Sequence, residues 1–324
     1  MNNFNIDLHC DLLYYLLRAD ASPDDKELGC SLPFLKEGNV RLQTMAIYAP
    51  TAKNSAILGF NQSEIFKNLI GNSNFFHFNL NNFDELENRN KVGILASVEN
   101  ASSFCEEDCH LDEGFENLEK IIQNTKNLLY IGLTHHSDNR FGGGNNSEAG
   151  IKSDGKILID YLSEKKIAID LAHTSDQLAY DILNYIDQRN YKISLLASHS
   201  NFRSVYRNNR NLPEELVREI VNRKGLIGLN FIKDYIDVQN PERLYKHIQY
   251  GVDSNATDSL AYGGDFFYDK NHPDKSRYPF FFKDFENAKA YNSINKRISE
   301  EFSSEIMSKI SHANALDFIK RLWA

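Results

Sequence analysis

The chain is poor in cysteine, in basic residues and in long apolar runs, and each scarcity excludes a class of protein. Four cysteines in 324 residues are too few for a disulfide scaffold, so we interpret them as free thiols of a reducing compartment. Lysine and arginine number 36 against 45 acidic residues, and the net charge of −9 argues against nucleic-acid and anionic-membrane partners. No apolar run could cross a bilayer, and no basic segment followed by an apolar stretch marks a secretion signal. We therefore expect a cytoplasmic protein with no membrane partner.

The remaining composition is that of an ordinary folded protein, with 41% hydrophobic and 25% charged residues. A length of 324 residues suits one large α/β barrel, a fold that typically takes about 250 residues before insertions. Internal repeats and low-complexity linkers are absent from the sequence. We predict a single domain over residues 1–324, with helices following Pro279.

Eight short apolar segments alternate with segments of helical spacing, and this alternation predicts a (β/α)8 TIM barrel. An open doubly wound sheet is the rival, but no glycine-rich phosphate loop follows the first strand. The expected strands are Ile6–Leu8, Leu42–Tyr48, Val92–Val98, Tyr130–Thr134, Ile167–Leu171, Ser194–Ala197, Leu226–Asn230 and Ser259–Gly263.

Two polar stretches lie between these segments. Gly71–Arg89 is rich in Asn and Phe and has no helical or strand periodicity, so we interpret it as a loop or irregular insertion. Ser137–Gly150 is rich in Gly, Asn and Ser, a composition that predicts a flexible, exposed loop.

Residues able to bind metal follow the expected strands with unusual frequency. In the first strand, His9 and Asp11 point to the same face because alternate side chains of a strand share a face. Barrel enzymes assemble their sites where the carboxyl ends of the strands meet, so these residues are expected to converge. The residues at predicted strand ends are His9, Asp11, Glu99, His135, His173, His199 and Asp265.

This set of side chains exceeds what one tetrahedral zinc ion requires, and it suits two metal ions about 3.5–4 Å apart. Glu99 is the natural bridge, since it has two oxygens and stands alone at its strand end. Two such ions would lower the pKa of a bridging water and polarise a carbonyl, as amide hydrolysis requires. Asp265 could then take the proton of that water and return it to the leaving amine.

The motifs around these positions resemble the membrane dipeptidase (renal dipeptidase) family of metallopeptidases, which have amidohydrolase-type barrels. The resemblance runs in order along nearly the whole chain. Its motifs are Asp7-Leu8-His9-Cys10-Asp11-Leu12, Val98-Glu99-Asn100, Leu133-Thr134-His135, Ile169-Asp170-Leu171-Ala172-His173, Ala197-Ser198-His199-Ser200, Arg210-Asn211-Leu212-Pro213-Glu214, Gly263-Gly264-Asp265-Phe266, Ser276-Arg277-Tyr278-Pro279 and Asn314.

The resemblance implies a role for each position and a binuclear site of two Zn²⁺ ions, or other divalent metals in their place. His9 and Asp11 would hold one ion, and Glu99 would bridge to the second. That second ion would be held by His173 and His199. The catalytic residues would be Asp265, as acid and base, and His135, which would contact the scissile carbonyl or the oxyanion. Substrate binding would also involve Arg210, whose planar fork suits the C-terminal carboxylate of a dipeptide.

These observations lead to a binuclear zinc dipeptidase that acts through a metal-bridging hydroxide, and the resemblance also implies a homodimer. The sequence departs from the family after Phe266, where Phe267-Tyr268 replaces Asp-Gly, so the pocket beside Asp265 is expected to differ. Two alternatives stay open. One is a related amidohydrolase for N-acyl-D-amino acids or other small amides, and the other is a barrel that binds a ligand without catalysis.

Overall fold

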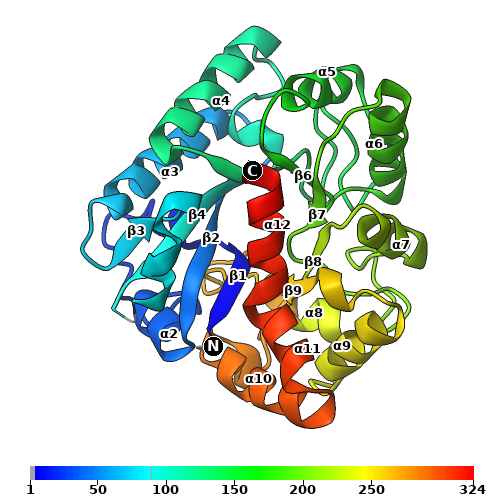
Figure 1. Cartoon of the computed structure of the whole chain (residues 1–324). Coiled ribbons are helices and arrows are strands. Elements are labelled where there is room, and N and C mark those ends of the chain that lie inside the picture. The colour runs from blue at the N-terminus through cyan, green and yellow to red at the C-terminus, as the bar shows by residue number, and fades with distance from the viewer. Residues whose placement is uncertain (1–3, 89) are drawn as a thin grey trace.

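The computed structural model describes residues 4–88 and 90–324 and shows a closed barrel of eight parallel strands surrounded by helices (Figure 1). Neighbouring strands pair in the order β1, β2, β4, β5, β6, β7, β8, β9, and β9 pairs with β1 to close the ring. The predicted TIM barrel is therefore confirmed. The barrel strands are β1 (Asn5–Cys10), β2 (Val40–Tyr48), β4 (Val92–Glu99), β5 (Leu128–Gly132), β6 (Ala168–Asp170), β7 (Leu195–Ala197), β8 (Leu226–Leu229) and β9 (Leu260–Tyr262).

Helices connect successive strands and cover the outside of the barrel. Their apolar faces pack on the strands, which are buried on both sides and therefore read as continuous apolar runs in the sequence. These helices are α1 (Leu12–Tyr15), α2 (Leu32–Glu37), α3 (Ser55–Ile70), α4 (Leu111–Thr125), α5 (Ser153–Leu162), α6 (Asp176–Arg189), α7 (Glu214–Asn222), α8 (Lys233–Ile236) and α9 (Arg243–Asp253). Among the helices of the described residues, none combines the length and the apolar character needed to cross a membrane.

The last helix, α12 (Asn314–Trp323), closes the amino-terminal end of the barrel. In Figure 1, α12 lies across the centre of the ring of strands. Phe318, Ile319 and Leu322 of α12 join the apolar cluster inside the barrel, and Asn314 donates a hydrogen bond to the carbonyl of Leu260, at the start of β9. The opposite end, where the carboxyl ends of the strands meet, is the end left for a site. Between β9 and α12 the chain forms α10 (Ala290–Glu301), α11 (Ser304–Ser308) and the π-helical turn η6 (Lys309–Ala313).

Two expectations about loops were wrong. The segment interpreted as an irregular insertion contains strand β3 (Phe75–His77), which pairs with the start of β4, and a 3₁₀ helix, η1 (Leu80–Glu87). Residue 89, in the same segment, lies outside the described residues. The glycine-rich segment 137–150 is largely packed rather than exposed, because Asn139 and Phe141 are buried and the side-chain amide of Asn139 donates hydrogen bonds to the side chain of Asn100 and to the carbonyl of Leu133. Composition reports the conformations a loop can adopt, and tertiary contacts decide whether it is buried.

Two glycines let strands β7, β8 and β9 approach one another at the rim. A Cβ atom on Gly228 or on Gly263 would overlap the backbone carbonyl oxygen of Ser198. We expect Gly228→Ala to lower the free energy of unfolding by about 3 kcal/mol, since neither backbone can move without breaking the ladder. Urea denaturation is the measurement. Gly71→Ala is the control, because that exposed glycine has room for a Cβ and its change is expected to stay within about 1 kcal/mol. Equal stability of the two variants would contradict this account.

Candidate metal centre

The residues predicted from strand ends come together at the carboxyl rim of the barrel. Glu99, the last residue of β4, places Oε1 3.0 Å from Nε2 of His173 and 3.3 Å from Nε2 of His199. Its other oxygen, Oε2, lies 3.7 Å from Nε2 of His9. Donor atoms of His9, Asp11 and Asp265 also lie within 4.8 Å of one another. The carboxylate of Glu99 therefore lies between two groups of donors and directs one oxygen toward each.

Hydrogen bonds behind three histidines fix which ring nitrogen faces this centre. The Tyr130 hydroxyl donates to the carbonyl of Leu8 at 2.9 Å and so accepts from Nδ1 of His9 at 2.8 Å. Nδ1 of His173 donates to the amide oxygen of Asn145 at 3.0 Å. A neutral imidazole carries one proton, so Nε2 of both rings is an unprotonated acceptor that faces Glu99.

His199 has the same orientation, supported by a serine and an aspartate. The Ser198 hydroxyl donates to Oδ2 of Asp170 at 2.5 Å and accepts from Nδ1 of His199 at 2.6 Å. Nε2 of His199 and Nε2 of His173 are then two lone pairs only 3.0 Å apart. Two lone pairs at that distance repel each other unless a cation lies between them. Nitrogen ligands of one tetrahedral zinc ion are about 3.3 Å apart, given zinc–nitrogen bonds of about 2.0–2.1 Å.

Further donor atoms of the cluster are buried without a partner. Among the described residues, Nε2 of His9 and Oδ1 of Asp11 have no hydrogen-bond partner. Burial, together with the charge of Asp265, raises the pKa of Asp11 well above its ordinary value. Burial and the nearby Asp11 likewise raise the pKa of Glu99. Buried carboxylates this close to one another stabilise bound cations, and the nitrogen and oxygen donors fit zinc or a similar divalent metal.

Asp265 lies beside His9 and is held by its own contacts. Oδ2 accepts a hydrogen bond from the side-chain amide of Asn230 at 2.8 Å, and Oδ1 lies 3.7 Å from Nε2 of His9. Burial raises the pKa of Asp265 to about 7, while the charge of Arg210 opposes that shift. A carboxyl group with a pKa near neutrality can both accept and return a proton. The left-handed φ of 58° at Asp265 and of 62° at His173 shows that the backbone is constrained at both positions.

Arg210 is a buried cation at the edge of the cluster. Its Nη1 donates to the Ser200 hydroxyl at 2.7 Å and its Nη2 to the carbonyl of His199 at 2.9 Å. Among the described residues its Nε has no partner, although Arg210 is only 4% exposed. The guanidinium is therefore oriented by the protein and retains a donor that a bound anion could use.

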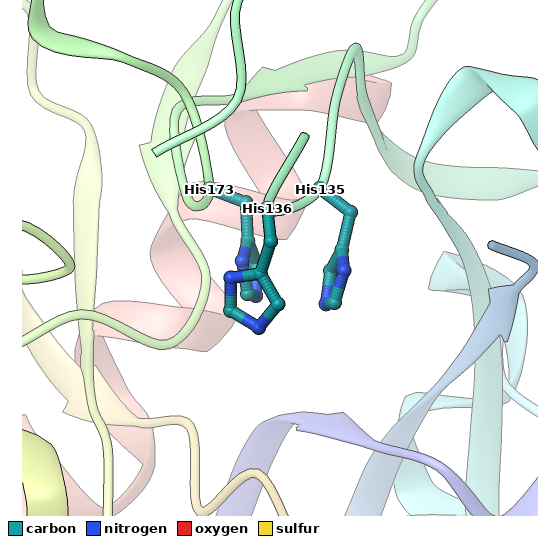
Figure 2. A group of neighbouring side chains, drawn as sticks. All are labelled: His135, His136 and His173. Carbon is teal, nitrogen blue, oxygen red and sulfur yellow. The ribbon is translucent and has the colours of Figure 1, made fainter. Parts of the chain in front are cut away.

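His135 lies near the carboxylate of Glu99, and beside it lies His136, which we did not predict as a site residue. Figure 2 shows His135, His136 and His173 extending in one direction from their loops. Nε2 of His135 is 3.8 Å from Oε1 of Glu99, and its side chain is 20% exposed, so it is open to a ligand. His136 donates from Nδ1 to the same Asn145 oxygen that holds His173.

Sequence reasoning missed His136 and the residues that orient the ligands: Tyr130, Asn145, Asp170, Ser198 and Asn230. The adjacency of His136 to His135 was the one available signal for the first. Tyr130, Asn145 and Asn230 gave none, because their partners are distant in the chain. Asp170 and Ser198 lie within the motifs around His173 and His199, but nothing in those motifs indicated their role.

Fold and site together define a (β/α)8 protein with a candidate metal centre of histidines and carboxylates at its carboxyl rim. The chain belongs to the membrane dipeptidase family (peptidase family M19), whose model matches residues 2–321.

Solved structures and curated relatives agree with this membership. A dipeptidase described as dipeptidase AC, a metallopeptidase of family M19, superposes with a TM-score of 0.81 at 19% identity over 99% of both chains. A metallopeptidase from Rhodobacter sphaeroides, bound to a phosphinate mimic of the dipeptide L-Ala-D-Ala, has a TM-score of 0.80 at 18% identity over the whole of both chains. At such identities the likeness establishes the fold.

Among curated proteins, "Dipeptidase aclJ" of Aspergillus oryzae is 21% identical over 86% of this chain and 69% of its own length. An uncharacterized protein of Acinetobacter calcoaceticus is 28% identical over 44% of this chain and 43% of its own length. A second, from Klebsiella pneumoniae, is matched over 54% of its length, so both of these matches span about half of the relative.

Proposed function

We propose that this protein is a metallodipeptidase that hydrolyses the peptide bond of dipeptides with two divalent metal ions, zinc first among them. The observation that carries the proposal is the convergence of three unprotonated Nε2 atoms on the carboxylate of Glu99. His9 and Asp11 would hold one ion, His173 and His199 the other, and Glu99 both. When bound, such ions supply an acidified water and polarise the scissile carbonyl.

The other residues would position the substrate and move the proton. The guanidinium of Arg210 would bind the C-terminal carboxylate, and His135 would donate to the carbonyl oxygen as it gains charge. Asp265 would accept the proton of the attacking water and return it to the leaving amine nitrogen. The side-chain amide of Asn230 holds this carboxylate beside His9, where it is placed for both transfers.

Metal analysis and a substrate panel test this proposal together. The purified protein is expected to contain two equivalents of divalent metal and to cleave L,L- or L,D-dipeptides. The phosphinate mimic of L-Ala-D-Ala held by the Rhodobacter sphaeroides protein is the reason to include the L,D series. Hydrolysis of N-acyl-D-amino acids with no dipeptide cleavage would favour the related amidohydrolase. If the protein stays metal-free and inactive on the whole panel after incubation with zinc, the result would favour a barrel that binds a ligand without catalysis.

Arg210→Lys is expected to raise KM for dipeptides by about 10- to 100-fold with little change in kcat. A lysine cannot keep the contacts to Ser200 and His199 and also present a planar fork to a carboxylate. Steady-state kinetics with a dipeptide and with its C-terminal amide measure this effect. The amide should be a poor substrate for both proteins alike, since it lacks the charge that Arg210 would bind.

Arg207→Lys is the matched control for this change. Arg207 lies in the same segment and is exposed, so its replacement should leave KM unchanged. If the two substitutions have the same effect on KM, Arg210 does not bind the carboxylate.

A further inference from the structure

We propose that Asp170 and Ser198 act as positioning residues: their hydrogen bonds hold the proton of His199 on Nδ1 and so keep Nε2 able to bind metal. The inference depends on the proposed function, because it concerns the metal position formed by His173 and His199. It adds that Asp170, which would touch neither substrate nor metal, decides whether the position formed by His173 and His199 can bind a metal ion.

Asp170 is held at the end of β6 by donors that leave one oxygen for Ser198. Oδ1 accepts the backbone N–H of Ser198 at 2.8 Å and of Ala172 at 3.0 Å. Oδ2 accepts the Ser198 hydroxyl at 2.5 Å. Asp170 is 1% exposed and Ser198 fully buried, so water does not compete for these bonds. Burial raises the pKa of Asp170, and the three hydrogen bonds oppose that shift by stabilising the carboxylate.

The direction of each bond follows from the number of protons. A carboxylate only accepts, so Ser198 must give its single proton to Asp170. The serine oxygen can then interact with Nδ1 of His199 only as an acceptor, and the imidazole proton is held on Nδ1. Nε2 remains a lone pair 3.3 Å from Oε1 of Glu99.

Replacing the aspartate by its amide should reverse this chain of bonds. Because Oδ1 of residue 170 faces two backbone N–H groups, the amide of Asp170→Asn would place its NH₂ group toward Ser198. The serine oxygen would accept from that NH₂ and give its own proton to Nδ1 of His199. The imidazole proton would then lie on Nε2, where it blocks metal binding. His9 and His173 would keep their orientation, since the Tyr130 hydroxyl still donates to the carbonyl of Leu8 and Asn145 still holds His173.

Nitrogen-15 NMR of histidine-labelled, metal-free protein reads the tautomer directly, with the His199 signals assigned through a His199→Gln variant. Wild-type protein should show a protonated Nδ1, and Asp170→Asn a protonated Nε2. Asp7→Asn is the matched control: Asp7 is also buried and accepts from two backbone N–H groups and from Tyr291, but it does not contact His199 through a hydroxyl. The His199 signals of this control should match those of the wild type.

Zinc titration against a competing chelator gives the second readout. Asp170→Asn should bind one of two equivalents about 10- to 100-fold more weakly, as expected for loss of a residue that orients a ligand. Ser198→Ala should show both tautomers of His199 and a smaller loss of affinity, and it tests the proposal if Asp170→Asn does not fold.

The inference would be overturned if His199 kept its proton on Nδ1 in Asp170→Asn. It would also be overturned if Ser198→Ala showed only that same tautomer. Failure of the proposed function is distinguishable, because wild-type protein would then bind no zinc, whatever the tautomer of His199.

Discussion

Removing divalent metal with a chelator is expected to abolish dipeptide hydrolysis, and adding zinc back is expected to restore it. The residual rate should fall at least about 10³-fold, because both the acidified water and the polarised carbonyl are lost together. The melting temperature should fall as well, since the buried carboxylates of Asp11, Glu99 and Asp265 would then repel one another without a cation. Metal content, initial rates and thermal denaturation, recorded on the same samples, are the measurements.

A chelator that does not itself bind the folded protein is needed to interpret that experiment, and dilution of the chelator without added metal is its control. Activity should return in proportion to zinc and saturate at two equivalents per chain. Full activity in protein shown to contain less than a tenth of an equivalent of any divalent metal would contradict the proposed mechanism.

Asp265→Asn is expected to reduce kcat by about 10²- to 10⁴-fold while the protein keeps its metal. An amide can still accept the hydrogen bond from Asn230 but cannot take up a proton from water and deliver it to an amine. The fold should be preserved, because the substitution is isosteric and the backbone N–H of residue 265 still bonds the carbonyl of His9. Rapid kinetics and metal analysis of one preparation separate the two effects.

Asp269→Asn is the control for this substitution. Asp269 lies four residues further along the same loop and is partly exposed, so its amide should leave kcat unchanged. Unchanged turnover in Asp265→Asn would remove Asp265 from the role of proton carrier, whereas loss of turnover together with loss of metal would assign it to metal binding instead.

Much of the candidate metal centre could be predicted because its histidines and carboxylates follow buried apolar runs, whereas Arg210, in a loop, was expected from the family resemblance alone. His9, Glu99 and His199 all lie at the ends of parallel strands, and the geometry of a closed barrel brings those ends together. The same reasoning failed for the segment that contains β3, because a three-residue strand has no measurable periodicity. It also failed for the loop holding Asn145, whose burial depends on contacts with distant residues.

The sequence by itself determined the barrel, the positions at its rim and the kinds of donor found there, since these follow from local periodicity and residue chemistry. Only the tertiary structure decided which nitrogen of each histidine faces the centre. That choice depends on hydrogen bonds to residues far away in the chain, as between His9 and Tyr130, 121 positions apart, or Asp170 and Ser198, 28 apart. A proton on an imidazole is placed by its neighbours in space, and those neighbours exist only once the barrel has closed.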